Sequence, residues 1–102
     1  MSQYDLSESD LTRIADAFNH AEQEAKNKSN GGKSVTQSIR HAQSELESVC
    51  PEIWWTNRDY EFDDICEKVK SIDSDVERRH EIVQDFHLHV IDLIYNELSI
   101  EP

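Results

Sequence analysis

Glycine and proline are scarce in this chain of 102 residues, which contains only two of each. Both glycines lie in the segment 27–33 (NKSNGGK), and the prolines are Pro51 and the C-terminal Pro102. A fold with many strands needs frequent tight turns, and glycine and proline are the main turn residues. The distribution therefore argues against such a fold. It favours a few long helical segments, separated near residues 27–33 and 52–58.

The apolar residues support this interpretation, because they recur at spacings of three and four, the period of a helix with one buried face. This pattern predicts helices at 9–28, 35–50, 59–72 and 75–98, with Pro51 ending the second. The first three stripes are Leu11, Ile14, Phe18, Ala21 and Ala25; then Val35, Ile39, Ala42, Leu46 and Val49; then Phe62, Ile65, Val69 and Ile72.

Serine residues followed three positions later by an acidic or amide residue predict where helices begin. In such a capping box, the serine accepts from a backbone N–H of the first turn and the later side chain bonds back to the serine N–H. The predicted pairs are Ser7 with Asp10, Ser34 with Gln37, and Ser74 with Glu77; Ser9 alone is the alternative cap for the first helix.

The last helix is the most apolar segment and carries two neighbouring stripes. We expect it to be buried over more than half of its circumference, either as the central helix or as a dimer interface. Residues 87–95 (HLHVIDLIY) also fit a strand, because apolar and polar residues partly alternate there. The two stripes are Val76, Val83, Phe86, Val90 and Leu93, and Ile91, Ile94 and Leu98.

These elements predict an all-α fold, a four-helix bundle of up-and-down topology with a long C-terminal helix. Residues 1–102 are the right number for a single domain, with 1–8 and 99–102 as candidate flexible ends. The N-terminal segment has no pattern of a secretory signal, and no apolar run is long enough to span a membrane. We therefore expect a cytoplasmic protein in which Cys50 and Cys66 are reduced, half-buried thiols.

The charge is strongly negative and unevenly distributed. The chain has 22 Asp and Glu against 10 Lys and Arg, which gives a net charge of −12. Residues 52–102 contain 14 of the acids and 5 of the bases, so this half carries −9. Such a field attracts basic proteins and repels nucleic acids and anionic membranes. We expect a basic protein as partner, itself a candidate nucleic-acid-binding protein, and no direct binding of nucleic acid or membrane.

No motif for catalysis or for a cofactor can be recognised. Residues 31–34 (GGKS) resemble the end of a phosphate-binding loop, but Asn27 replaces the first glycine of that motif and a helix precedes it. Residues 59–67 (DYEFDDICE) lack the central glycine of a calcium loop. Arg13 and His20, with six residues between them, have a spacing found in helical ribonucleases, but the acidic chain would repel RNA.

The five histidines show no pair at the spacing of three or four that places two metal ligands on one helical face. The sequence thus predicts a protein that is not an enzyme and has no metal site and no cofactor.

Two adjacent tryptophans and a run of acids form the candidate partner-binding set. Trp54 and Trp55 cannot easily both point into a small core, and an exposed aromatic residue rimmed by acids has the composition of a binding hot spot. We predict that the contacts come from Trp54, Trp55, Asp59, Glu61, Asp63, Asp64, Glu67, Asp73, Asp75, Glu77, Glu81 and Asp85.

Two functions fit this set. The first is an acidic inhibitor that docks on the basic, nucleic-acid-binding surface of a nuclease, toxin or phage-defence component, as immunity and anti-defence proteins of similar size and charge do. The alternative is a helical adaptor, chaperone or regulatory subunit that binds through an apolar surface. Homodimerisation through the C-terminal helix is compatible with both.

Overall fold

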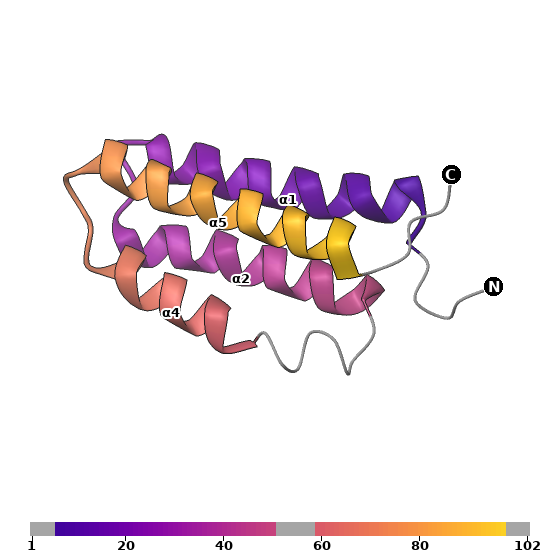
Figure 1. Ribbon diagram of the computed structural model, residues 1–102. Helices are drawn as coiled ribbons and strands as arrows, with labels where there is room; N and C mark the ends of the chain where they lie inside the picture. The colour runs from indigo at the N-terminus through magenta and orange to yellow at the C-terminus, as the bar shows by residue number, and fades with distance from the viewer. Residues whose placement is uncertain (1–5, 51–58, 98–102) are drawn as a thin grey trace.

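The computed structural model describes residues 6–50 and 59–97, and the ordered elements within them are all helical (Figure 1). These are α1 (Glu8–Lys26), α2 (Gly32–Val49), α4 (Asp59–Lys70) and α5 (Val76–Glu97). The predicted all-α fold is confirmed, and each helix lies within a few residues of its expected range. The alternative strand at 87–95 is wrong, because α5 passes through this segment without interruption.

The four helices form an up-and-down bundle. Helices α1 and α4 each pack against both α2 and α5, so the order around the bundle is α1, α2, α4, α5. Neighbouring helices are antiparallel, as Figure 1 shows. Side-chain pairs link all four seams: Arg13 with Glu45 between α1 and α2, Arg40 with Asp63 between α2 and α4, Glu61 with His89 between α4 and α5, and Glu22 with His87 between α1 and α5.

Three phenylalanines from three helices form the centre of the core. Phe62 and Phe86 meet edge to face with their ring centroids 4.9 Å apart, and Phe18 lies 6.3 and 6.1 Å from them. Such contacts between aromatic rings add about 0.5–1.5 kcal/mol per pair to the free energy of burial. The aliphatic residues buried around them include Leu6, Ile14, Val35, Ile39, Leu46, Val69, Val83, Val90 and Ile94.

Helix α5 occupies one corner of the bundle and is not central. Its buried side is a single stripe; in the second apolar stripe Ile94 is buried and Ile91 is half-buried, while Leu98 lies outside the described residues. On the solvent side, Leu88 and Tyr95 are 57% and 62% exposed. The expectation of burial around more than half of the helix is therefore wrong for α5 in this chain, because only α1 and α4 pack extensively against it.

The start of α1 agrees with the sequence prediction, since Ser7 and Asp10 form the complete capping box. The predicted start of the second helix at Ser34 is wrong. Helix α2 begins at Gly32 with Gly31 as its N-cap, because the carboxylate of Asp73 accepts the Gly32 N–H at 2.8 Å. The Asp73 side chain, from the turn between α4 and α5, thus accepts the Gly32 N–H. With Ser34 as the N-cap, this N–H would have belonged to the loop before the helix.

Gly32 also allows the helices to approach closely. A Cβ at this position would lie 2.3 Å from the backbone oxygen of Val69 and 2.6 Å from that of Lys70, at the end of α4. Only a residue without a side chain fits between the two backbones. Gly32 is therefore a packing site and not merely a residue of the loop between helices.

The predicted capping box at Ser74 and Glu77 is also wrong. Helix α5 begins at Val76, and the side chain of Asp75 accepts the N–H of Arg78 at 3.1 Å. Asp75 therefore acts as the N-cap, a role for which aspartate is among the preferred residues.

A fully buried arginine fastens this end of the bundle. Arg79 is 0% exposed, and it donates through Nε to the oxygen of Ala25 and through Nη2 to that of Asn27, at 2.9 and 3.0 Å. Its Nη1 reaches the oxygens of Ile72 and Asp73 at 3.0 and 3.4 Å. The guanidinium therefore donates to carbonyl oxygens at the C-terminal end of α1 and in the turn that follows α4, where the negative ends of the two helix dipoles lie.

Both cysteines are free and buried, each 7% exposed. Burial raises the pKa of Cys50 to about 12, with a smaller contribution from the carboxylate of Asp10, and burial also raises the pKa of Cys66. The thiolate is the reactive form, so both thiols are protected at neutral pH.

We expect a disulfide reagent such as DTNB at pH 8 to label both thiols on the order of 100-fold more slowly in the native protein than in urea. The absorbance of the released thiolate measures the rate. Equal rates with and without urea would contradict the buried positions.

Candidate protein-binding surface

The negative charge is concentrated on the side of the bundle that α4 and α5 form. Residues 59–97 contain 12 acids and 4 bases, whereas residues 6–50 contain 7 acids and 5 bases. Because α4 and α5 pack side by side, most of the net charge lies on two adjacent helices and their connecting turn. We call this region the acidic side.

Several predicted contact residues on the acidic side already have partners at the surface. Asp63 meets Arg40 at 2.8 Å, Glu67 meets Lys70 at 2.9 Å, Glu61 meets His89 at 2.7 Å, and Glu81 meets Arg78 at 3.6 Å. Both members of the Asp63–Arg40 pair are about half exposed. Solvent-exposed pairs contribute about 0–1 kcal/mol, so the exposed carboxylates of Asp63, Glu67 and Glu81 can exchange partners at little cost.

Three other predicted residues perform structural roles. The carboxylates of Asp73 and Asp75 accept backbone N–H groups at the starts of α2 and α5. Asp59 accepts from the side-chain amide of Gln43 and lies toward α2. Burial and the nearby Asp59 carboxylate both raise the pKa of Glu47, so these two acids repel each other across the seam.

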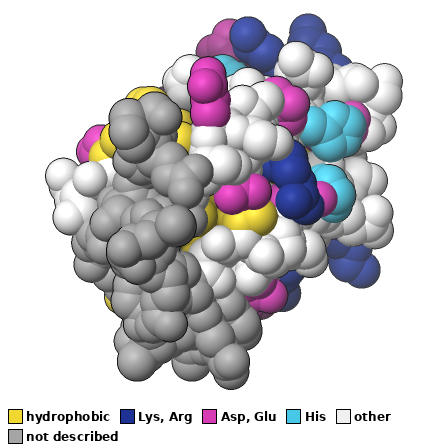
Figure 2. Space-filling view, turned by 90° about the vertical axis from the view of Figure 1, so that its right-hand side faces the viewer, with side chains coloured by type: hydrophobic (Ala, Val, Ile, Leu, Met, Phe, Trp, Pro, Cys, Tyr) yellow, Lys and Arg dark blue, Asp and Glu magenta, His cyan; other side chains and the backbone are white. Residues whose placement is uncertain are grey.

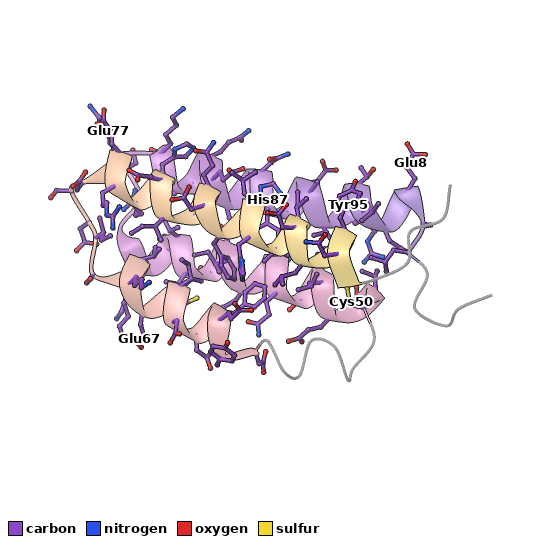
Figure 3. The ribbon with its side chains drawn as sticks, in the orientation of Figure 1. Glu8, Cys50, Glu67, Glu77, His87 and Tyr95 are labelled. Atoms are coloured by element: carbon purple, nitrogen blue, oxygen red, sulfur yellow. The ribbon has the colours of Figure 1, made fainter. Side chains whose placement is uncertain are left out.

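Asp64, Glu77 and Asp85 are exposed and have no ion pair within the described parts of the chain. They are the predicted contacts with the most accessible charge. Figure 3 shows Glu77 at the start of α5 and Glu67 near the end of α4, both projecting away from the bundle at the same end. Trp54 and Trp55 lie outside the described residues.

An apolar hollow lies between α1 and α5, at the end of the bundle where α1 begins. Its volume is about 250 Å³, below the roughly 300–1,000 Å³ of typical small-molecule sites. The hollow therefore suits a few side chains of a protein better than a free ligand. Its lining residues are Glu8, Leu11, Thr12, Ile14, Ala15, Ile91, Ile94 and Tyr95.

The seam between α1 and α2, which lies opposite the acidic side, has a mixed polar surface. Figure 2 shows histidine and basic side chains next to acidic ones along one side of the bundle. Arg13 and His20 both line a shallow hollow there, with His41 and Glu45 on α2. Arg13 is held by Glu45, whose carboxylate accepts from Nη2 at 2.6 Å and from Nε at 3.1 Å. In residues 6–50 and 59–97, no three His, Cys, Asp or Glu side chains gather as metal ligands would.

One polar pair at the edge of the core, His87 with Glu22, is not evident from the sequence pattern. His87 is 8% exposed and stacks on Phe18 with ring centroids 4.8 Å apart and planes within 5°. Its Nδ1 lies 3.3 Å from a carboxylate oxygen of Glu22, and its Nε2 is buried with no hydrogen-bond partner among the described residues. The available signal was position: His87 follows Val83 by four residues and precedes Val90 by three, within the buried stripe.

Comparisons with protein-family models, with curated proteins and with solved structures gave no match to this chain. Within residues 6–50 and 59–97, no helix combines the length and the apolar content that a membrane span requires.

Proposed function

We propose that this chain is a non-catalytic binding protein whose acidic side docks on a basic surface of another protein. The observation that carries the proposal is the excess of 12 acids over 4 bases in residues 59–97, which two adjacent helices hold together. Negative potential of this extent speeds the approach of a positively charged partner and orients it.

Inhibition is the outcome that we favour. Basic protein surfaces of this extent commonly bind nucleic acid, and an acidic protein that covers such a surface excludes its substrate. The partner would then be a nuclease, a toxin or a phage-defence component. Asp64, Glu77 and Asp85 would make the main contacts. Asp63, Glu67 and Glu81 would follow by exchanging their exposed intramolecular partners for groups on the target.

The test begins with a pull-down from the native host, followed by measurement of the partner's affinity for nucleic acid with and without this protein. We expect competition, and we expect the protein–protein affinity to fall at least about 10-fold between low and high salt. The triple variant Asp64→Lys, Glu77→Lys and Asp85→Lys should lose about 10-fold or more at low salt, because each reversal places a positive charge against a basic surface.

Controls on α1 and on the fold separate local from general effects. Asp16 is exposed on α1, and Asp16→Lys changes the net charge by as much as each single reversal on the acidic side. This variant should nevertheless keep the affinity for the partner within about 3-fold of the parent protein. Equal losses in this variant would assign the effect to net charge alone. Circular dichroism should show unchanged helix content in all variants.

The second candidate function is an adaptor that binds through apolar contacts, which the exposed Leu88 and Tyr95 favour. Binding that is insensitive to salt and to the charge reversals, but lost on truncation of these two side chains, would select the adaptor.

A further inference from the structure

The solvent side of α5 carries acidic side chains with two large apolar side chains among them. Glu81, Asp85, Leu88, Asp92 and Tyr95 follow one another at spacings of four, three, four and three residues, so they form a single exposed stripe. Leu88 and Tyr95 are both more than half exposed. Two large apolar side chains in water are thus flanked along the helix by carboxylates.

The apolar part of this stripe continues into the hollow between α1 and α5. Tyr95 lines that hollow, with Leu11 and Ala15 on the α1 side and Ile91 and Ile94 on the α5 side. Glu8 lines its edge, and Figure 3 shows Glu8 and Tyr95 at the same end of the bundle. Among the described residues that line it, none is a lysine, arginine or histidine. We call the hollow, together with Leu88, the α1/α5 groove.

We propose that the α1/α5 groove binds an amphipathic helix that carries lysine or arginine beside its apolar stripe. Residues 88–95 of α5 and 8–15 of α1 each span two turns, about 10 Å, which matches apolar anchors at positions i, i+3/i+4 and i+7 of a docked helix. The acids beside Leu88 and Tyr95 complement basic flanking residues. A second copy of this chain fits less well, since each copy carries −12.

This inference rests on the proposed function, because it names the element of the basic partner that makes the apolar contact. The acidic side would steer and hold the partner's basic surface, while the groove would take the apolar stripe of a helix from the same partner. The two sites share α5 but differ in their other wall, α4 for the acidic side and α1 for the groove.

The test uses the intact chain and a designed 18-residue helical peptide with leucines at i, i+3, i+4 and i+7 flanked by lysines and arginines. Two further peptides serve as references: one with the same composition in scrambled order, and one with glutamates in place of the basic residues. Calorimetry measures affinity, and ¹H–¹⁵N spectra of the protein locate the contact. We expect the first peptide to bind at least 10-fold more tightly than either reference, with shifts centred on residues 8–15 and 88–95.

The double variant Leu88→Ala and Tyr95→Ala should weaken this binding at least 10-fold. Both side chains are exposed, so their removal should spare the fold. Tyr60→Ala is the matched control, because Tyr60 is 63% exposed on α4, away from the groove, and its removal should leave the affinity within about 2-fold.

Three results would overturn the inference. These are equal binding of the scrambled peptide, spectral shifts centred on α4, or self-association of the free protein through residues 88–95. The proposed function fails by a different result, namely a host partner whose affinity responds neither to salt nor to charge reversal on the acidic side. If the basic peptide does not bind at the α1/α5 groove but partner binding still depends on salt, the acidic side alone would be the binding surface.

Discussion

Replacement of Arg79 by alanine is expected to lower the free energy of unfolding by about 3–5 kcal/mol, the largest effect of any single substitution that we predict. The change removes the guanidinium donor from four carbonyl oxygens, of which only that of Asn27 keeps another donor among the described residues, the N–H of Asn30, and it opens a cavity at a position that is 0% exposed. A domain of this size has roughly 5–15 kcal/mol in total, so the variant should be close to unfolded. Urea titration followed by circular dichroism measures the loss.

Two further variants separate the buried contacts from the charge. Arg79→Lys keeps the charge but replaces the planar guanidinium with a compact ammonium group. It should therefore lower the free energy of unfolding by less than Arg79→Ala does. Arg78→Ala is the adjacent control. Its side chain is 58% exposed and pairs only loosely with Glu81, so the change should stay within about 0.5 kcal/mol. Equal effects at positions 78 and 79 would contradict the role that we assign to Arg79.

Replacement of Gly32 by alanine is expected to have the second largest effect, lowering the free energy of unfolding by about 2–3 kcal/mol or more. Within a helix, alanine is ordinarily better than glycine by about 1 kcal/mol, so propensity alone predicts the opposite sign. The added Cβ would lie 2.3 Å from the backbone oxygen of Val69, and a backbone atom cannot move aside as a flexible side chain can. The ends of α2 and α4 would have to separate.

Gly31→Ala provides the comparison, because a Cβ there would meet only the Asp73 carboxylate, at 3.1 Å. We expect a change within about 1 kcal/mol by the same urea titration, since that side chain can shift slightly. A Gly32→Ala protein as stable as the parent would show that the two helix ends are not in close contact.

Amphipathic periodicity predicted the architecture well because each helix buries one stripe against its neighbours. Of the ten residues predicted in the stripes of the first two helices, eight are buried and two, Leu11 and Val49, are partly exposed; the stripes left out the buried Ala17 and Gly32. The helix starts were harder to predict, because their caps depend on contacts distant in sequence. Asp73 satisfies the first turn of α2 from 41 residues away, and local patterns around Ser34 contain no information about that contact.

Polar residues inside the apolar stripes were the second source of error. Arg79 and His87 occupy buried positions of α5, where spacing alone would have placed them in the core. Their charge and polarity made an exposed position the natural expectation. For the candidate binding surface, the sequence predicted which helices carry the acids, but it could not distinguish carboxylates that cap helices, such as Asp73 and Asp75, from those that face solvent.

Arg79 binds carbonyl oxygens at the end of α1 and in the α4–α5 turn. We therefore expect local unfolding to be rarer at this end of the bundle than at the other end. Ala25 and Asn27 are separated from this arginine by 54 and 52 residues, so fraying of either helix end there requires the loss of contacts with the other. Amide protons near this fastened end should therefore exchange with solvent through larger, rarer openings than those near the start of α1. The α1/α5 groove lies at the opposite end of the bundle from Arg79. Small conformational changes that accompany binding there would not require the Arg79 hydrogen bonds to break.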